Sequence, residues 1–350
     1  MKKVIFCILF LMFISIRMPY AEELETFEEV YCDNTTGPGH YSSFSDALMH
    51  VEEDGTVYVG KEIKIYNPIQ ISKSVKIKSL NREIYPVRIQ QNMNQVFYLE
   101  NISWFTLENI YILGWSVDVI EGKADQITIQ DSKFENCNPI YVSGNSGYNI
   151  KMEGNSLIKA KVEIKPTVGE NIAHLLDNQF TVPSGSQESI IFMNTNLEVS
   201  GNTFDRYSLI LENGAEIEGN IHHNIFSGSV GKILIKNQGE NVHFYMNKIL
   251  KDFNGAITYV GNETADFTKN WWGSKDGPVQ DIIIGNIDYS CWALFEDFRR
   301  FEGDDYTLAD LEEACLQLGQ EINEDSWLYN LRNDSVIDIL DLVGITRNIE

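Results

Sequence analysis

The chain has 350 residues and a formal net charge of −24 at pH 7, from 51 acidic and 27 basic residues. A field of that sign repels nucleic acids and anionic membrane surfaces, so we expect neither as a partner. It also argues against a polyanionic substrate, while it favours solubility and the binding of cations.

The N-terminus has the composition of a secretory signal peptide. Lys2 and Lys3 precede an apolar run over residues 4–16, and Ala21 follows. The run is short for a membrane span. We therefore expect residues 1–21 to be removed, which leaves a charge of −27 because they hold three cations and no acid. The mature chain would then have no membrane span and would be secreted, to the extracellular space, the cell surface or the periplasm; a retained N-terminal anchor is the alternative.

The segment after the signal peptide predicts a helical cap. Residues 45–51 can form a short amphipathic helix, and the alternating runs 56–59, 69–77 and 87–99 follow it. A helix over the first strands would cover an open sheet edge. We assign residues 22–55 to an N-terminal cap and residues 56–295 to the fold that follows.

That fold is built from a repeat in which a small polar residue stands two positions before a large apolar one. The steps between the polar residues are 23, 23, 23, 24, 22, 23 and 23. The polar residues are Asn109, Ser132, Asn155, Asn178, Asn202, Asn224, Asn247 and Asn270, and their apolar partners are Tyr111, Phe134, Leu157, Phe180, Phe204, Phe226, Ile249 and Trp272. Units this small cannot fold alone and must stack on their neighbours.

Within each unit, apolar residues alternate at a spacing of two, as in Ile127 and Ile129 or in Ile150 and Met152. This is the pattern of a strand with one buried face. One period holds about three short strands with turns between them, and asparagine suits a turn because it tolerates left-handed backbone angles. The sequence therefore predicts an all-β solenoid, a parallel β-helix; a β-sandwich, the alternative, does not repeat side chains at fixed spacing.

Two strings at the end of the repeats carry a family resemblance. Residues 269–278 are Lys-Asn-Trp-Trp-Gly-Ser-Lys-Asp-Gly-Pro, and residues 285–292 are Gly-Asn-Ile-Asp-Tyr-Ser-Cys-Trp. They resemble the closing strings of secreted bacterial β-helix proteins of the pectin lyase-like superfamily, with Cys291 in place of a usual proline. The resemblance covers residues 30–295 and implies a right-handed parallel β-helix. It implies little about function, because the superfold hosts lyases, hydrolases, adhesins and a periplasmic copper-associated family.

Residues 300–350 form a different region, with helices expected over 307–318 and 338–349. The string from Asn330 to Leu342 resembles one half of a degenerate dockerin, whose calcium loop precedes a helix. The resemblance gives Asn330, Asp334, Asp338 and Asp341 the loop positions one, five, nine and twelve, whereas Arg332 replaces the oxygen ligand at position three. It implies a calcium ion, the one cofactor that the sequence suggests, and a cohesin-like docking partner.

Four cysteines remain after processing, Cys32, Cys137, Cys291 and Cys315, and none forms a Cys-x-x-Cys pair. Cys32 and Cys137 lie several coils apart, too far for a disulfide. Cys291 with Cys315 is the one pairing that we consider.

Stacking makes neighbours of residues one period apart, so outward columns can be predicted. His174, Glu198, His222, His243 and Asp266 fall on one such stripe, which we call the outward stripe. Imidazole and carboxylate groups together suit substrate binding, general acid/base chemistry on a glycan, or a transition metal. A solvated polar face with scattered histidines is the alternative. The catalytic strings of polysaccharide-cleaving β-helices are missing, so no catalytic residue is assigned.

The sequence favours a secreted, non-catalytic β-helix scaffold that binds a surface glycan or a cell-surface protein along an outward sheet. A polysaccharide lyase or glycoside hydrolase is one alternative. A periplasmic metal-binding β-helix is the other.

Overall fold

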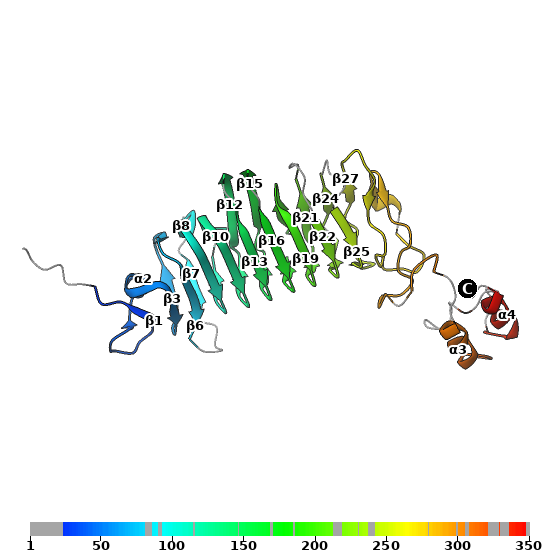
Figure 1. Cartoon of the computed structure of the whole chain (residues 1–350), viewed down its shortest axis with the longest axis horizontal. Helices are drawn as coiled ribbons and strands as arrows, with labels where there is room; N and C mark the ends of the chain where they lie inside the picture. Colours follow the sequence, from blue (N-terminus) through cyan, green and yellow to red (C-terminus); the bar gives the residue numbers. More distant parts are fainter. Residues whose placement is uncertain are drawn as a thin grey trace, which may run out of the picture.

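The protein is a mostly β parallel solenoid of about 10 turns, elongated along one axis, with two short helices beyond its C-terminal end (Figure 1). The predicted all-β solenoid, a parallel β-helix, is confirmed. The computed structural model describes residues 24–80, 86–89, 93–114, 116–145, 147–168, 171–184, 186–212, 219–229, 231–236, 242–278, 280–298, 300–304, 308–320, 329 and 336–347.

Each full coil contributes three strands, as expected, and the strands stack in three rows. In one coil, β13 (Asn149–Glu153), β14 (Ser156–Ile158) and β15 (Val162–Val168) follow one another, and β16 (Ile172–Leu176) then stacks in parallel on β13. Two long strands, β8 (Gln95–Glu108) and β10 (Asp118–Gln130), run from row three into row one without a break.

Row one contains β13, β16 and the ends of β8 and β10, together with β1 (Phe27–Cys32), β2 (His40–Tyr41), β3 (Val51–Val59), β6 (Val75–Ser79), β19 (Asn196–Ser200), β22 (Gly219–His222), β25 (Val242–Tyr245), β28 (Ala265–Asp266) and β30 (Ile287–Asp288). Row two contains β14 with β4 (Ile63–Ile65), β7 (Pro86–Ile89), β9 (Tyr111–Leu113), β11 (Lys133–Glu135), β17 (Gln179–Thr181), β20 (Thr203–Asp205), β23 (Ile225–Ser227) and β26 (Lys248–Ile249). Row three contains β15 and the starts of β8 and β10, with β5 (Ile69–Ile71), β12 (Asn138–Asn145), β18 (Glu188–Phe192), β21 (Tyr207–Leu211), β24 (Ile233–Ile235), β27 (Ile257–Tyr259) and β29 (Ile283–Ile284).

The repeated asparagines form a buried hydrogen-bonded ladder at the turn between rows one and two. The side-chain oxygen of each accepts from the backbone N–H and the side-chain amide of the asparagine one coil earlier, as Asn202 does from Asn178 at 2.9 and 3.0 Å. The ladder starts at Ser132, whose N–H donates to Asn155 at 2.9 Å, and it ends at Asn270. Buried polar groups must be paired, and identical neighbours pair each other in every coil.

The ladder corrects our reason for the asparagines. They do not adopt left-handed backbone angles; the residue before each one does. These preceding residues are Asp131, Gly154, Asp177, Gly201, His223, Met246 and Lys269. Asparagine is thus selected for its side-chain donor and acceptor rather than for turn geometry.

The register predicted for the first repeat was wrong by one residue. Lys133 stacks on Tyr111 and Phe134 on Ile112, so Ile110 lies where later coils have the ladder residue. Asn109 aligns with the left-handed Asp131 and itself has a φ of 54°. Tyr111 is only half-buried, and its hydroxyl donates to Glu135 at 2.7 Å.

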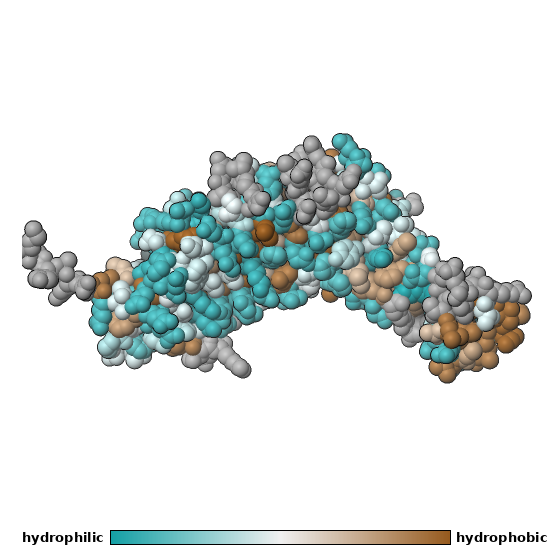
Figure 2. Space-filling model, viewed as in Figure 1, coloured by the Kyte–Doolittle hydropathy of each residue, from teal (hydrophilic) through white to brown (hydrophobic). Residues whose placement is uncertain are grey.

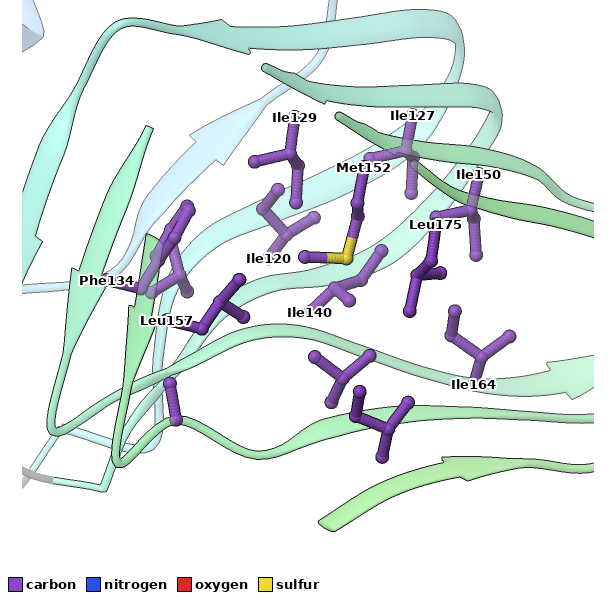
Figure 3. Packing of buried hydrophobic residues seen from close by; sticks show 14 of the residues in the cluster. Ile120, Ile127, Ile129, Phe134, Ile140, Ile150, Met152, Leu157, Ile164 and Leu175 are labelled. Carbon is purple, nitrogen blue, oxygen red and sulfur yellow. The ribbon is translucent and has the colours of Figure 1, made fainter. Parts of the chain in front are cut away.

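The interior is filled by apolar side chains in columns, in close contact across the coils (Figure 3). Ring stacking extends along row two, with centroid distances of 5.0 Å for Phe180 and Phe204 and 4.8 Å for Phe204 and Phe226. Trp272 continues this column and is 5 % exposed, so it closes the last coil from inside.

A short helix, α2 (Phe44–His50), caps the N-terminal end, one residue from the bounds that we predicted. Its N-cap is Ser43, which accepts from the N–H of Asp46 at 3.3 Å. Phe44, Ala47 and Leu48 form its buried face. Serine at this position satisfies a backbone donor that the helix itself cannot pair.

The C-terminal region holds a 3₁₀ turn, η1 (Gln280–Ile282), and two helices, α3 (Leu308–Leu316) and α4 (Ile339–Arg347), close to the predicted 307–318 and 338–349. The two helices pack through Ala314, Leu342 and Ile345. Across the described residues, no helix has the length and apolarity needed to span a membrane.

Candidate functional site

All five residues of the outward stripe lie on the outer face of row one. His174 and Glu198 are neighbours in one column, and Asn220, His243 and Asp266 continue it coil by coil. His222 belongs to the next column, between Ser200 and Tyr245. The structure therefore brings the predicted residues to one face, in two adjacent columns.

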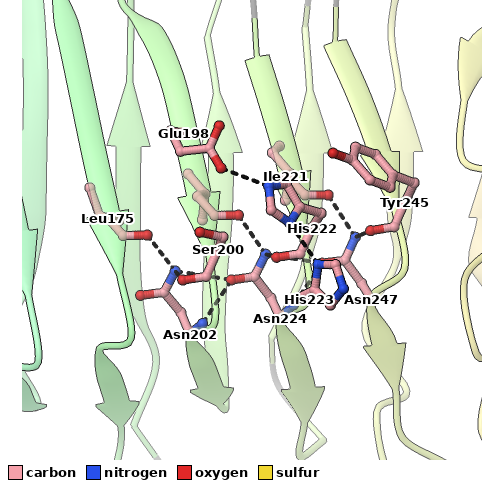
Figure 4. A network of polar contacts seen from close by, with 11 residues as sticks. Leu175, Glu198, Ser200, Asn202, Ile221, His222, His223, Asn224, Tyr245 and Asn247 are labelled. Atoms are coloured by element: carbon pink, nitrogen blue, oxygen red, sulfur yellow. Dashed lines mark hydrogen bonds and ion pairs between the residues drawn. The ribbon is translucent and has the colours of Figure 1, made fainter. Parts of the chain in front are cut away.

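Glu198, His222 and His223 form a continuous chain of contacts on this face (Figure 4). Nε2 of His222 lies 2.6 Å from Oε1 of Glu198, and Nδ1 of His222 lies 2.7 Å from Nδ1 of His223. The His222 ring also stacks on Tyr245, with 5.0 Å between centroids and 24° between planes. His222 is held on three sides, so its orientation is fixed.

The contacts also determine which nitrogens carry protons. A carboxylate only accepts, so His222 donates its Nε2–H to Glu198. In neutral His222, Nδ1 is then an acceptor and receives the Nδ1–H of His223, which leaves Nε2 of His223 without a proton. Burial and the neighbouring charge of His222 lower the pKa of His223, which favours this neutral form.

His243 and Asp266 form a second pair. Nδ1 of His243 lies 3.3 Å from Oδ2 of Asp266, whose other oxygen accepts from the N–H and the hydroxyl of Thr268 at 3.0 and 2.8 Å. Burial raises the pKa of Asp266, but the hydrogen bonds from Thr268 and His243 outweigh it, and the pKa falls below its ordinary value. Asp266 is thus ionised at neutral pH and orients His243.

The remaining member, His174, has no hydrogen bond or ion pair among the described residues and is half-buried. Lys151, which lies one coil before His174 in the same column, pairs with Glu153 at 2.6 Å. The two imidazole–carboxylate pairs of this face are therefore Glu198–His222 and His243–Asp266.

Metal ligation by the stripe stays a prediction. In the part of the chain that the structure describes, no three His, Cys, Asp or Glu side chains are grouped to hold a metal ion. His222 and His243 each have a carboxylate partner instead, on Glu198 and Asp266.

The loop predicted to bind calcium is described only in part, since Asn330 and Asp334 lie outside the described residues. Asp338 is the N-cap of α4 and accepts from the N–H of Leu340 at 2.7 Å, while Asp341 accepts from the N–H of Asp338 at 2.8 Å. Asp341 stands three residues after the N-cap and accepts from its N–H, as in a capping box, so both carboxylates take part in helix formation. Calcium binding stays a prediction.

The four described cysteines are free thiols. Cys32 and Cys137 are buried, and burial raises the pKa of Cys32 to about 11 and that of Cys137 to about 12. Cys291 and Cys315 are exposed and do not form the disulfide that we considered.

His223 and Tyr245 were not among the predicted site residues. His223 occupies the left-handed corner column with a φ of 55°, where other coils have Gly, Asp, Met or Lys, so the repeat gave no reason to select it. The available signal was the His-His dipeptide itself, because two adjacent imidazoles at a corner can turn toward each other.

Searches of family models, curated proteins and solved structures found no match to this chain.

Proposed function

We propose that the protein is a secreted, non-catalytic scaffold whose outward stripe binds a neutral surface glycan. The main observation in support is that two oriented histidine–carboxylate pairs, Glu198–His222 and His243–Asp266, lie on an open sheet face. Each pair presents donors and acceptors in fixed directions, and sugar hydroxyls need both.

The form of the face supports binding of an extended polymer. Successive coils repeat at about 4.8 Å, so polar side chains recur in straight lines along the axis. Figure 2 shows this face as largely hydrophilic. Three clefts in the described part of the chain are lined by residues of its N-terminal half and by none of the stripe. The chain's charge of −24 favours a neutral ligand over an acidic one.

A glycan array probed with the mature chain tests this proposal. For a glycan that is retained, Tyr245→Ala should weaken binding about tenfold, because it removes the ring that holds His222 in place. Tyr98→Ala is the matched control, since Tyr98 is 37 % exposed on the outer side of row three. Retention of no glycan, or equal weakening by both variants, would sink the proposal; binding of a cell-surface protein is then the next hypothesis.

One observation favours a second candidate, a carbohydrate-active enzyme. The chain from Glu198 through His222 leaves Nε2 of His223 as an unprotonated base at the surface. Positioned bases contribute about 10²–10⁴-fold to rates. If the wild-type chain cleaves the bound glycan and His223→Gln does not, the enzyme hypothesis would replace the scaffold hypothesis.

We further propose membership of the pectin lyase-like superfamily and a degenerate dockerin-like tail with a cohesin-like partner. The parallel coils and the α3–α4 pair support these two proposals.

A further inference from the structure

The N-terminal end of the solenoid has two strand edges without partners in the described part of the chain. β4 pairs only with β7, and β5 pairs only with β8. Row one differs, because it continues outward through β1 to β2. Open edges carry unpaired N–H and C=O groups, which can accept a further strand.

A cleft of about 990 Å³ lies beside these edges, between α2 and the segment that holds β4 and β5. Apolar side chains of both walls line it, including Leu48, Met49, Ile65 and Tyr66. Met49 and Tyr66 are 54 % and 60 % exposed, so the apolar lining is accessible from outside. The space beside β4 is therefore both unfilled and partly apolar.

The cleft is basic although the chain is acidic. Its lining holds three basic residues, Lys61, Lys64 and Lys73, and one acidic residue, Glu62, a net charge of +2, against −24 for the whole chain. Lys61 and Lys73 bond to the backbone carbonyls of Ser42 at 2.6 Å and Met49 at 3.2 Å, whereas Lys64 has no side-chain partner among the described residues.

We propose that this cleft binds an extended acidic peptide segment of another protein, which adds as a strand to the free edge of β4. Backbone hydrogen bonds to that edge supply affinity. Alternation of the peptide then points every second side chain toward Leu48 and Ile65 and the others outward beside Lys64. An acidic side chain there is a cross-strand partner for the Lys64 ammonium group.

The probe is a fluorescent synthetic peptide of alternating valine and glutamate, titrated with the mature chain and followed by anisotropy. We expect saturable binding that Lys64→Glu weakens about tenfold. Lys251→Glu is the charge-matched control, because Lys251 is exposed at the other end of the solenoid. Lys64→Ala serves as a second variant if Lys64→Glu loses the circular dichroism spectrum of the wild type.

Two peptide controls separate strand addition from charge attraction. The same peptide methylated on every backbone nitrogen has no N–H to donate to a strand edge and carries a methyl group on both of its own edges, so we expect no binding from it. Equal affinity for the methylated peptide would overturn the proposal. Absence of binding would also overturn the proposal. Lys64 would then protect the short edge strand from pairing, which is another role of lysines on edge strands. Self-association of the chain that depends on Lys64 would make a second copy the occupant and would equally overturn it.

Discussion

Asn202 and His222 belong to successive coils; Asn202 lies inside, at the turn after row one, and His222 lies on the outer side of row one. The Asn202 side chain has no solvent exposure and is bonded to both adjacent coils and to its own turn, whereas the His222 ring contacts Glu198, His223 and Tyr245 on the outer face. Inside, every coil must offer its neighbour the same donor and acceptor, so the residue type repeats. Outside, water can satisfy any polar group, and the residue type is free to vary and to serve binding.

The largest effect is expected from Asn202→Ala. This change removes the acceptor of the Asn178 N–H and side-chain amide, and it removes the side-chain donor to the Leu175 carbonyl and to Asn224. Each buried unsatisfied group costs about 1–3 kcal/mol, so the free energy of unfolding should fall by about 3–5 kcal/mol. Urea denaturation measures it.

Asn220→Ala is the matched control, because Asn220 is exposed in the outer column of the same sheet. Its effect should stay within about 0.5 kcal/mol. Similar losses for the two variants would remove the distinction between the inner and outer sides.

The outer pair should couple far more weakly. A double-mutant cycle with Glu198→Gln and His222→Asn should give a coupling free energy below about 1 kcal/mol in the free energy of unfolding. The two side chains are 30 % and 21 % exposed, so salt should reduce the coupling further. A coupling above about 2 kcal/mol would mean that the pair supports the fold in the way the ladder does.

The sequence predicted the coils and the ladder positions because burial enforces a fixed spacing. It misplaced Asn109, since a small polar residue before an apolar one has the same pattern whether it lies in the ladder or at the left-handed corner. It also gave the asparagines the wrong role, because spacing does not reveal backbone angles. Only the alignment of several coils in space distinguishes the column of ladder residues from the column of left-handed corner residues.

For the site, the same periodicity placed five residues on one face but did not show which would meet. Glu198 reaches His222 diagonally, across one coil and one column, while its neighbour in the column, His174, has no hydrogen bond or ion pair in the part of the chain that the structure describes. Such contacts depend on side-chain rotamers, which the aligned sequence of the repeats does not specify. His223 was missed for the related reason that a corner residue faces neither column.

The smallest effect concerns pH and tests whether His223 belongs to the site. Burial and the adjacent charge of His222 lower the pKa of His223 below the ordinary value near 6.5, and Glu198 is the acidic group at the other end of the chain. The unfolded state then binds more protons than the folded state between the two pKa values. The contribution of His223 to the free energy of unfolding is therefore complete above a pH of about 6.5 and is lost as the pH falls through its lowered pKa.

Replacement by His223→Gln should flatten the dependence of unfolding free energy on pH in that window, while Asn220→Ala, on the same face and without a titratable group, should leave it unchanged. Urea unfolding at a series of pH values measures both slopes. An unaltered slope in His223→Gln would show that the ring titrates as it does in the unfolded chain. His223 would then be one more solvated corner residue, and the base that the second candidate function requires would be lost with it.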